Sequence, residues 1–191
     1  MSITEKFDRL ARGYSEHDYA DPARYAERRA EVVLATGPAV PAGATVLDLA
    51  CGDANMAEPL LARGYHYVGV DGSGEMIAEA KRRLGDRVAL THALIDQYAP
   101  DATVDVTVCL RAFYYPADRV AFFRDVARYT RCKFVFDFDP RVYSRAEIER
   151  DLRAAGFGEI VLQPFFLPQR VSVPAPLRAM LTLSSPQLLA N

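Results

Sequence analysis

The chain has 191 residues, of which 50% are hydrophobic and 25% are charged, the composition of a folded globular domain with a core. Its formal net charge of −2 and its three widely spaced cysteines exclude a strongly basic nucleic-acid-binding surface, a disulfide framework and a cysteine metal site. We expect a cytoplasmic protein that binds neither nucleic acid nor metal nor membrane, since the chain begins with no secretory signal and no apolar run approaches the roughly 18 residues that span a bilayer.

The first 40 residues are polar and aromatic, and we expect them to form a helical cap on a second unit over residues 41–191. A helix is predicted over 22–36. Asp21 suits the position before the helix, because its side chain can accept a hydrogen bond from the first turn. Pro22 suits that first turn, and Gly37-Pro38 ends the helix.

From residue 45, short apolar runs alternate with helical stretches. Strands are predicted over 45–49, 67–71, 87–91, 104–110, 133–138 and 158–165, and helices over 54–62, 74–84, 116–129 and 144–155. Strands that are apolar on both faces indicate a parallel sheet covered on both sides. The expected fold is therefore α/β, a Rossmann-like, doubly wound and mostly parallel sheet with helices on both faces.

The sequence after the sixth predicted strand is broken by prolines and contains no convincing strand after Phe166. Residues 177–183 are the only candidate, and they suit a helix at least as well. An open edge strand favours aggregation unless it is shielded. We expect either that the sequence stops short of a final strand or that a partner covers the edge, and self-association into a homo-oligomer stays open.

The turn after the first predicted strand carries the most informative motif. The strand runs into small residues, Ala50-Cys51-Gly52-Asp53-Ala54, and then into a helix. Small residues let a ligand approach the backbone, and the start of a helix offers unpaired N–H groups. Asp48 would repel the pyrophosphate of a dinucleotide and instead suits a cationic ligand.

Asp48, Ala50, Gly52 and Ala54 resemble the first motif of the class I S-adenosylmethionine-dependent methyltransferases, an acidic residue followed by alternating glycines. Alanine stands at two of the three glycine positions. The resemblance extends loosely over residues 5–165. It implies S-adenosylmethionine as the cofactor, with Asp48, Ala50 and Gly52 among its binding residues. A generic strand–helix turn of an α/β protein is the alternative.

A second motif follows the second predicted strand. Asp71 comes about 20 residues after Gly52, the separation at which an acid of a Rossmann-like site binds ribose hydroxyls. The alternative for Asp71 is to cap the helix that begins near Gly74, a role that Asp71 or Ser73 could fill, and the two roles are compatible. The resemblance further implies that Gly72 and Met76 lie near the adenine and the ribose.

The third predicted strand departs from the family pattern. The family usually has an acid at the position of Leu94, which accepts a hydrogen bond from the adenine amino group. Leucine cannot accept one. We expect backbone groups near Leu94 and Ile95, together with apolar packing, to hold the adenine, or Asp96 to substitute.

The loop after the fourth predicted strand should face the methionine part of the cofactor, because ligands of this fold bind at the carboxyl ends of the strands. Leu110 is expected to contact the cofactor. Arg111 is a candidate catalytic residue that could bind an anionic substrate or the methionine carboxylate, or could instead form a structural ion pair. Asp137 and Asp139, after the fifth strand, could position the substrate or cap their loop. The loop lacks the Asn-Pro-Pro-Tyr sequence of enzymes that methylate a base amino group.

The predicted cap supplies three further candidates. By resemblance, Tyr14 would touch the methionine end of the cofactor, and Arg29 could reach its carboxylate. A general base is needed only if the acceptor must lose a proton. His17 is the preferred candidate, although a surface or packing histidine is the alternative.

The sequence therefore predicts an enzyme that transfers a methyl group from S-adenosylmethionine to a small-molecule acceptor, with oxygen or carbon favoured over nitrogen. Two alternatives stay open. The chain could bind S-adenosylmethionine for chemistry other than methylation, or it could be a non-catalytic α/β binding module.

Overall fold

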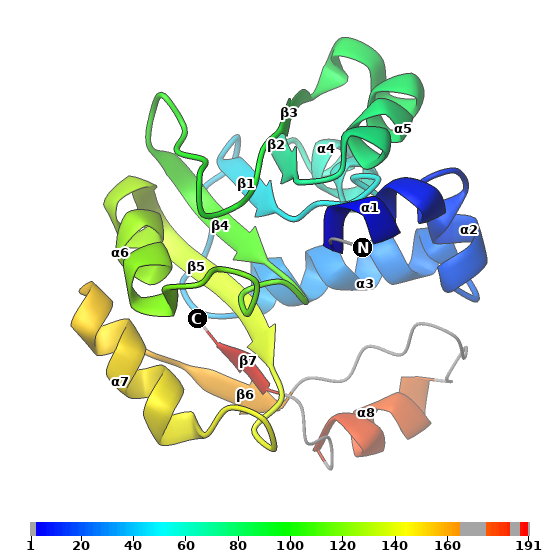
Figure 1. The fold of residues 1–191 in the computed structure, drawn as a ribbon. Helices are drawn as coiled ribbons and strands as arrows, with labels where there is room; N and C mark the ends of the chain where they lie inside the picture. The colour runs from blue at the N-terminus through cyan, green and yellow to red at the C-terminus, as the bar shows by residue number, and fades with distance from the viewer. Residues whose placement is uncertain (1–2, 165–174, 184–187, 191) are drawn as a thin grey trace.

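The computed structural model describes residues 3–164, 175–183 and 188–190. Seven strands form one sheet in the order β3-β2-β1-β4-β5-β7-β6 (Figure 1). The strands are β1 (Thr45–Leu49), β2 (His66–Asp71), β3 (Ala89–His92), β4 (Val104–Cys109), β5 (Thr130–Phe138), β6 (Leu162–Pro164) and β7 (Leu188–Ala190). The neighbouring pairs among β1 to β5 are parallel, and β7 runs antiparallel to both β5 and β6.

Helices cover both faces of this sheet (Figure 1). They are α1 (Ile3–Leu10), α2 (Tyr14–Asp18), α3 (Pro22–Ala35), α4 (Ala57–Ala62), α5 (Gly74–Leu84), α6 (Arg119–Tyr129), α7 (Arg145–Ala155) and α8 (Ala175–Leu183), and a 3₁₀ turn spans Gly85–Arg87. Apolar side chains of α3, α4 and α5 share one core with Val46 of β1. Those of α6 and α7 share the other core with Leu47. Neighbouring residues of a strand thus face opposite layers, as the doubly wound prediction requires.

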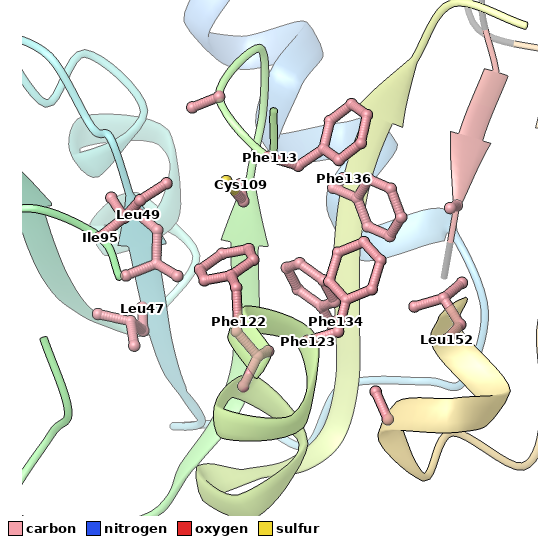
Figure 2. Packing of buried hydrophobic residues seen from close by; sticks show 14 of the residues in the cluster. Leu47, Leu49, Ile95, Cys109, Phe113, Phe122, Phe123, Phe134, Phe136 and Leu152 are labelled. Atoms are coloured by element: carbon pink, nitrogen blue, oxygen red, sulfur yellow. The ribbon is translucent and has the colours of Figure 1, made fainter. Parts of the chain in front are cut away.

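The core under α6 and α7 is rich in phenylalanine (Figure 2). Phe122 and Phe123 of α6 meet Phe134 and Phe136 of β5, and the Phe123 and Phe136 ring centroids lie 5.1 Å apart. Burying one such side chain stabilises the fold by about 1.5–3 kcal/mol. This packing fixes β4 and β5, and with them the loops at their carboxyl ends.

Polar side chains cap the first turns of two helices. The Asp21 side chain accepts a hydrogen bond from the Arg24 N–H at 3.0 Å, as predicted for the start of α3. Ser73 caps α5 in the same way, through the Met76 N–H at 3.1 Å. Each cap satisfies one of the N–H groups that a helix leaves unpaired in its first turn.

The C-terminal part of the described chain corrects one prediction. Residues 188–190 form β7, which lies between β5 and β6 and closes the sheet, so the expected lack of a strand after residue 166 was wrong. Periodicity cannot reveal a strand of three residues. Residues 177–183 lie in α8, the helical option. The sixth strand is shorter than predicted, Leu162–Pro164, and its predicted end at residue 165 lies outside the described residues.

The N-terminal segment contains more helix than predicted. Besides α3, it forms α1 and α2 (Figure 1). Ala30 and Val33 of α3 are fully buried against the sheet. In the part of the chain described here, no helix is both long and apolar enough to cross a membrane.

Candidate functional site

A cavity of about 490 Å³ opens at the carboxyl ends of β1 to β4. It lies where the strand order reverses between β1 and β4, the place where doubly wound proteins bind ligands. Its volume suits a small molecule. The predicted site residues that line it are Tyr14, Arg29, Ala50, Gly52, Asp71, Gly72, Met76, Leu94, Ile95, Leu110 and Arg111. The fold therefore brings residues from the cap, all four strand ends and α5 to one space.

The turn from β1 to α4 has an unusual backbone. Ala50, Gly52 and Ala54 have φ angles of 57°, 59° and 55°, in the left-handed region that favours glycine. These are the positions of the alternating glycines in the predicted motif. Alanine at two of them keeps the small size of the turn and adds backbone strain of about 1–2 kcal/mol per residue.

Asp71 joins two of the turns that line the cavity. Its carboxylate accepts hydrogen bonds from the Gly52 N–H at 2.7 Å and from the Ser73 N–H at 2.8 Å. Burial raises the pKa of Asp71, although the two N–H donors oppose this effect. Of the two residues predicted as caps, Ser73 fills the role, and its hydroxyl also donates to Asp8 of α1 at 2.6 Å.

Arg29 lies buried at the other end of the cavity. Its Nη1 donates to Asn55 Oδ1 at 3.2 Å, and Asn55 Nδ2 donates to Ser15 Oγ at 3.0 Å. Although burial disfavours its charge, the negative charge of Asp48 raises the pKa of Arg29, so the guanidinium stays charged. Its Nε is buried without a hydrogen-bond partner among the described residues. A buried cation with an unpaired donor favours an acceptor or a negative charge beside it.

Asp48, predicted as a cofactor-binding residue, is not among the residues that line the cavity. It is fully buried behind the wall, where it accepts a hydrogen bond from the Tyr67 hydroxyl at 2.8 Å. Burial raises the pKa of Asp48, and the charge of Arg29 opposes that shift. The structure thus places Asp48 as a partner of Arg29.

The side of the cavity expected to hold an adenine is apolar. Leu94 is 42% exposed, an unusual position for a large aliphatic side chain. A Cβ at Gly72 would lie 3.0 Å from Leu94 Cδ2 and 3.2 Å from Thr4 Cγ2, so these two side chains would have to shift slightly to accept a larger residue. Ile95, Asp96 and Leu110 line the same cavity.

The loop after β4 brings a second arginine to the cavity. Arg111 has a φ of 64°, and its backbone N–H donates to Asp137 Oδ1 at 2.5 Å. Asp137 is buried at the end of β5, where burial raises the pKa of its carboxyl. Asp139 instead pairs with Arg141 and does not line the cavity.

Several residues line the cavity that were not predicted as site residues. The polar ones are Asp53, Asn55 and Ser73, and the aromatic ones are Tyr19, Tyr25, Tyr114 and Tyr115. Tyr19 and Tyr25 stack with their ring centroids 4.1 Å apart. The sequence could have indicated the polar residues, because a polar residue such as Asn55 directly follows the turn of small residues. The cap tyrosines are recognised only once α2 and α3 are folded against the loop after β4.

None of the three histidines, including the candidate base His17, is among the residues that line the cavity. His17 is exposed, and its ring nitrogen bonds the Gly13 carbonyl at 2.6 Å within its own turn. His92 contacts the Gly72 carbonyl at 3.1 Å from the outer side. Among the described residues, no group of three or more His, Cys, Asp or Glu side chains could hold a metal ion.

Residues 46–133, which include β1 to β4 and the cavity loops, match a family model described as a methyltransferase domain. This match covers a little under half of the chain, and it agrees with the resemblance drawn from Asp48, Ala50, Gly52 and Ala54. The chain is also 30% identical over 115 residues to an uncharacterized methyltransferase of Geobacillus sp. (strain WCH70), a match that covers 60% of this chain and 51% of that protein. The chain thus spans about half the length of this curated relative.

Solved structures share the fold of this chain. A chain of the complex between the Haloferax volcanii Trm112 methyltransferase activator and its methyltransferase partner aligns with a TM-score of 0.76 at 23% identity, over 99% of this chain and 97% of that one. The CcbJ methyltransferase of Streptomyces caelestis aligns with a TM-score of 0.74 at 15% identity, over 100% and 98%. Magnesium protoporphyrin IX methyltransferase of Synechocystis PCC 6803, solved with bound S-adenosylmethionine, gives 0.60 at 19% identity, over 100% and 84%.

Proposed function

We propose that this protein transfers a methyl group from S-adenosylmethionine to a small-molecule acceptor. The observation that carries the proposal is the composition of the cavity at the strand ends. A carboxylate, an apolar face and a buried guanidinium with a free donor line one space. These groups complement the ribose, the adenine and the carboxylate of the cofactor.

Asp71 would accept hydrogen bonds from the ribose hydroxyls, because a carboxylate has lone pairs left after its two backbone donors. Gly72 and Met76 would lie against the nucleoside. Leu94 and Ile95 would pack on the adenine, since Leu94 is exposed at this side of the cavity. A nucleoside that covers Leu94 would remove its apolar surface from water.

Arg29 would receive the methionine carboxylate. Its unpartnered Nε supports this role, because a carboxylate would satisfy a donor that is buried without a partner among the described residues. Tyr14 would lie next to the same end of the cofactor. Asp48 would act indirectly, because its negative charge keeps Arg29 charged and in place.

The residues of this chain would act mainly through alignment. When bound, S-adenosylmethionine supplies a methyl group already activated by its positively charged sulfur. The cavity walls would then orient the acceptor and exclude water. We favour an oxygen or carbon acceptor, because the loop over residues 109–116 lacks the Asn-Pro-Pro-Tyr sequence and the cap presents flat aromatic rings.

We further propose that residues 1–40 act as the cap and residues 41–191 as the cofactor-binding unit. Within the cap, α1 and α2 would cover the cavity, since Phe7, Leu10 and Tyr14 line it. Helix α3 would anchor the cap to the sheet.

Calorimetric titration tests the proposal. S-adenosylmethionine and its demethylated product, S-adenosylhomocysteine, are expected to bind with micromolar Kd, and NAD is expected not to bind. Arg29→Gln should weaken the binding of both sulfur ligands at least about tenfold, because a charge-assisted hydrogen bond contributes roughly 1.5–3 kcal/mol. The exposed Arg124→Gln serves as the matched control and should bind as wild type does. If wild type binds neither sulfur ligand, the proposal fails.

A further inference from the structure

Arg111 stands out because the cavity contains two arginines and the cofactor carboxylate needs only one. Arg29 lies beside Asn55 and Asp48, at the end of the first strand–helix turn. Arg111 comes from the loop after β4. Among the residues that the structure describes, neither guanidinium forms an ion pair with a carboxylate. The charge of Asp137 acts on Arg111 as that of Asp48 acts on Arg29.

The surroundings of Arg111 are aromatic. Its guanidinium interacts with the hydroxyl of Tyr25 and lies near Tyr19. Its charge also reaches Tyr14 and Tyr114. The rings come from both sides of the cavity mouth, since three belong to the cap segment and one to the loop after β4. An arginine among aromatic faces is suited to a ligand that combines a flat body with a negative charge.

The backbone of Arg111 is strained. A φ of 64° is strained for a residue with a side chain, and such strain persists where the surroundings fix it. Here the Asp137 carboxylate fixes it, by accepting the Arg111 N–H at 2.5 Å. Because that carboxylate is engaged with the backbone, it positions the arginine without forming an ion pair with its guanidinium.

We propose that Arg111 binds the carboxylate of a flat, aromatic methyl acceptor, whose ring lies among the tyrosines at the mouth of the cavity. This inference rests on the proposed function and names its substrate class. Arg111 is then a specificity-determining residue, and Asp137 is its positioning residue. Arg29 serves the cofactor.

The test uses the full chain saturated with S-adenosylhomocysteine. The probes are 4-hydroxybenzoate, salicylate and indole-3-acetate, each titrated beside its own primary amide, which keeps the shape and removes the charge. At least one carboxylate should bind at least about tenfold tighter than its amide, the usual effect of a charge-assisted hydrogen bond. In Arg111→Gln this preference should fall to within about twofold, while the affinity for S-adenosylhomocysteine stays unchanged.

Lys6→Gln is the matched control, because Lys6 is the other cation of the cap that lines the cavity. It should keep the preference for carboxylates. The proposal is overturned if no carboxylate is preferred over its amide, or if the preference survives in Arg111→Gln. It is also overturned if Arg111→Gln loses affinity for S-adenosylhomocysteine, since Arg111 then holds the cofactor. Failure of wild type to bind S-adenosylhomocysteine would instead refute the proposed function itself.

Discussion

At the scale of single residues, the strained alanines of the cofactor turn make a prediction about stability. Ala50 has a φ of 57° and is only partly buried. Ala50→Gly should raise the free energy of unfolding by about 0.5–1 kcal/mol, because relief of left-handed strain outweighs the backbone entropy of glycine. Denaturant unfolding monitored by circular dichroism measures the change.

The control for this substitution is Ala78→Gly. Ala78 is exposed in the interior of α5, where glycine lowers stability by about 1 kcal/mol. The two substitutions should therefore have opposite signs. Equal destabilisation by both would show that Ala50 does not hold the left-handed backbone in solution.

Asp71 predicts a pH dependence of ligand binding. Burial raises its pKa above the ordinary value of 3.8. Donors on a ribose favour the carboxylate, so ligand binding lowers this pKa again. Affinity for S-adenosylhomocysteine should therefore be highest above the pKa of the free protein and fall as the pH is lowered through it.

Calorimetry over a pH series checks this expectation. Asp71→Asn should bind at least about tenfold more weakly at neutral pH and should lose much of the acid dependence. Asp86→Asn, an exposed change outside the cavity, should reproduce the wild-type profile. An Asp71→Asn profile that still falls as steeply as wild type would assign the dependence to another acid of the cavity, such as Asp53.

At the scale of elements, α6 and α7 are joined by charges at the edge of the phenylalanine core. Arg119 donates to Glu147 at 2.6 Å and, through Nε, to Asp151 at 2.9 Å. Burial alone would raise the pKa of Asp151, but hydrogen bonds from Arg119 and Arg150 lower it below its ordinary value. A lowered pKa contributes stability above the unfolded pKa, which is lost as the pH falls through the folded one.

Asp151→Asn should therefore lower the free energy of unfolding by about 1–3 kcal/mol at neutral pH. The difference from wild type should stay constant down to about pH 5 and shrink below about pH 4. Unfolding measured across this range tests it. The control is Asp125→Asn, which breaks an exposed pair with Arg128 and should change little. A pH-independent difference would mean that Asp151 acts through packing alone.

Strand β7, which the sequence did not suggest, leads to a prediction about stability. Leu188 is 2% exposed and belongs to the core formed with β5 and α7. Leu188→Ala should lower the free energy of unfolding by about 2–5 kcal/mol. Leu183→Ala, at an 81% exposed position of α8, should have almost no effect. Similar small effects for both would mean that β7 does not complete the sheet in solution.

At the scale of the whole molecule, the sequence predicted the architecture better than the site. Alternation of apolar runs and helices was enough for the doubly wound sheet, because each strand such as Thr45–Leu49 must bury both faces. Motif spacing was enough to place Asp71 and Gly52 at one cavity. It could not tell that the Asp48 side chain is fully buried. It also could not tell that the His17 ring bonds the carbonyl of Gly13 within its own turn.

The sequence did not show how the tyrosines of the cap and of the loop after β4 are arranged. Tyr19 and Tyr25 lie far along the chain from Tyr114, and only the docking of the cap places them at one cavity. Such contacts depend on the relative position of elements, which local periodicity does not encode. The anion site inferred at Arg111 therefore needed the tertiary structure.

The cap itself gives the last prediction. The polar contacts that tie helices α1 and α2 to the turns after β1 and β2 include Asp8 with Ser73 at 2.6 Å and Ser15 with Asn55 at 3.0 Å. Segments outside the central sheet generally open at a lower free energy than core strands. A ligand that lies under the cap and contacts Tyr14 should add to those contacts and hold the cap closed.

Hydrogen exchange of the full chain measures this. Saturating S-adenosylhomocysteine should slow amide exchange over residues 4–18 at least about tenfold, which corresponds to roughly 1.4 kcal/mol of added protection. Ser15→Ala should speed exchange of the same residues in the free protein and leave β4 and β5 unchanged, because it removes the acceptor of Asn55 without touching the sheet. Thr182→Ala, in α8, is the control and should leave exchange of the cap as in wild type. If residues 4–18 of the free wild-type protein already exchange as slowly as β4, the cap is a fixed wall of the cavity. The acceptor would then enter between Tyr114 and the cap, without any opening of α1 and α2.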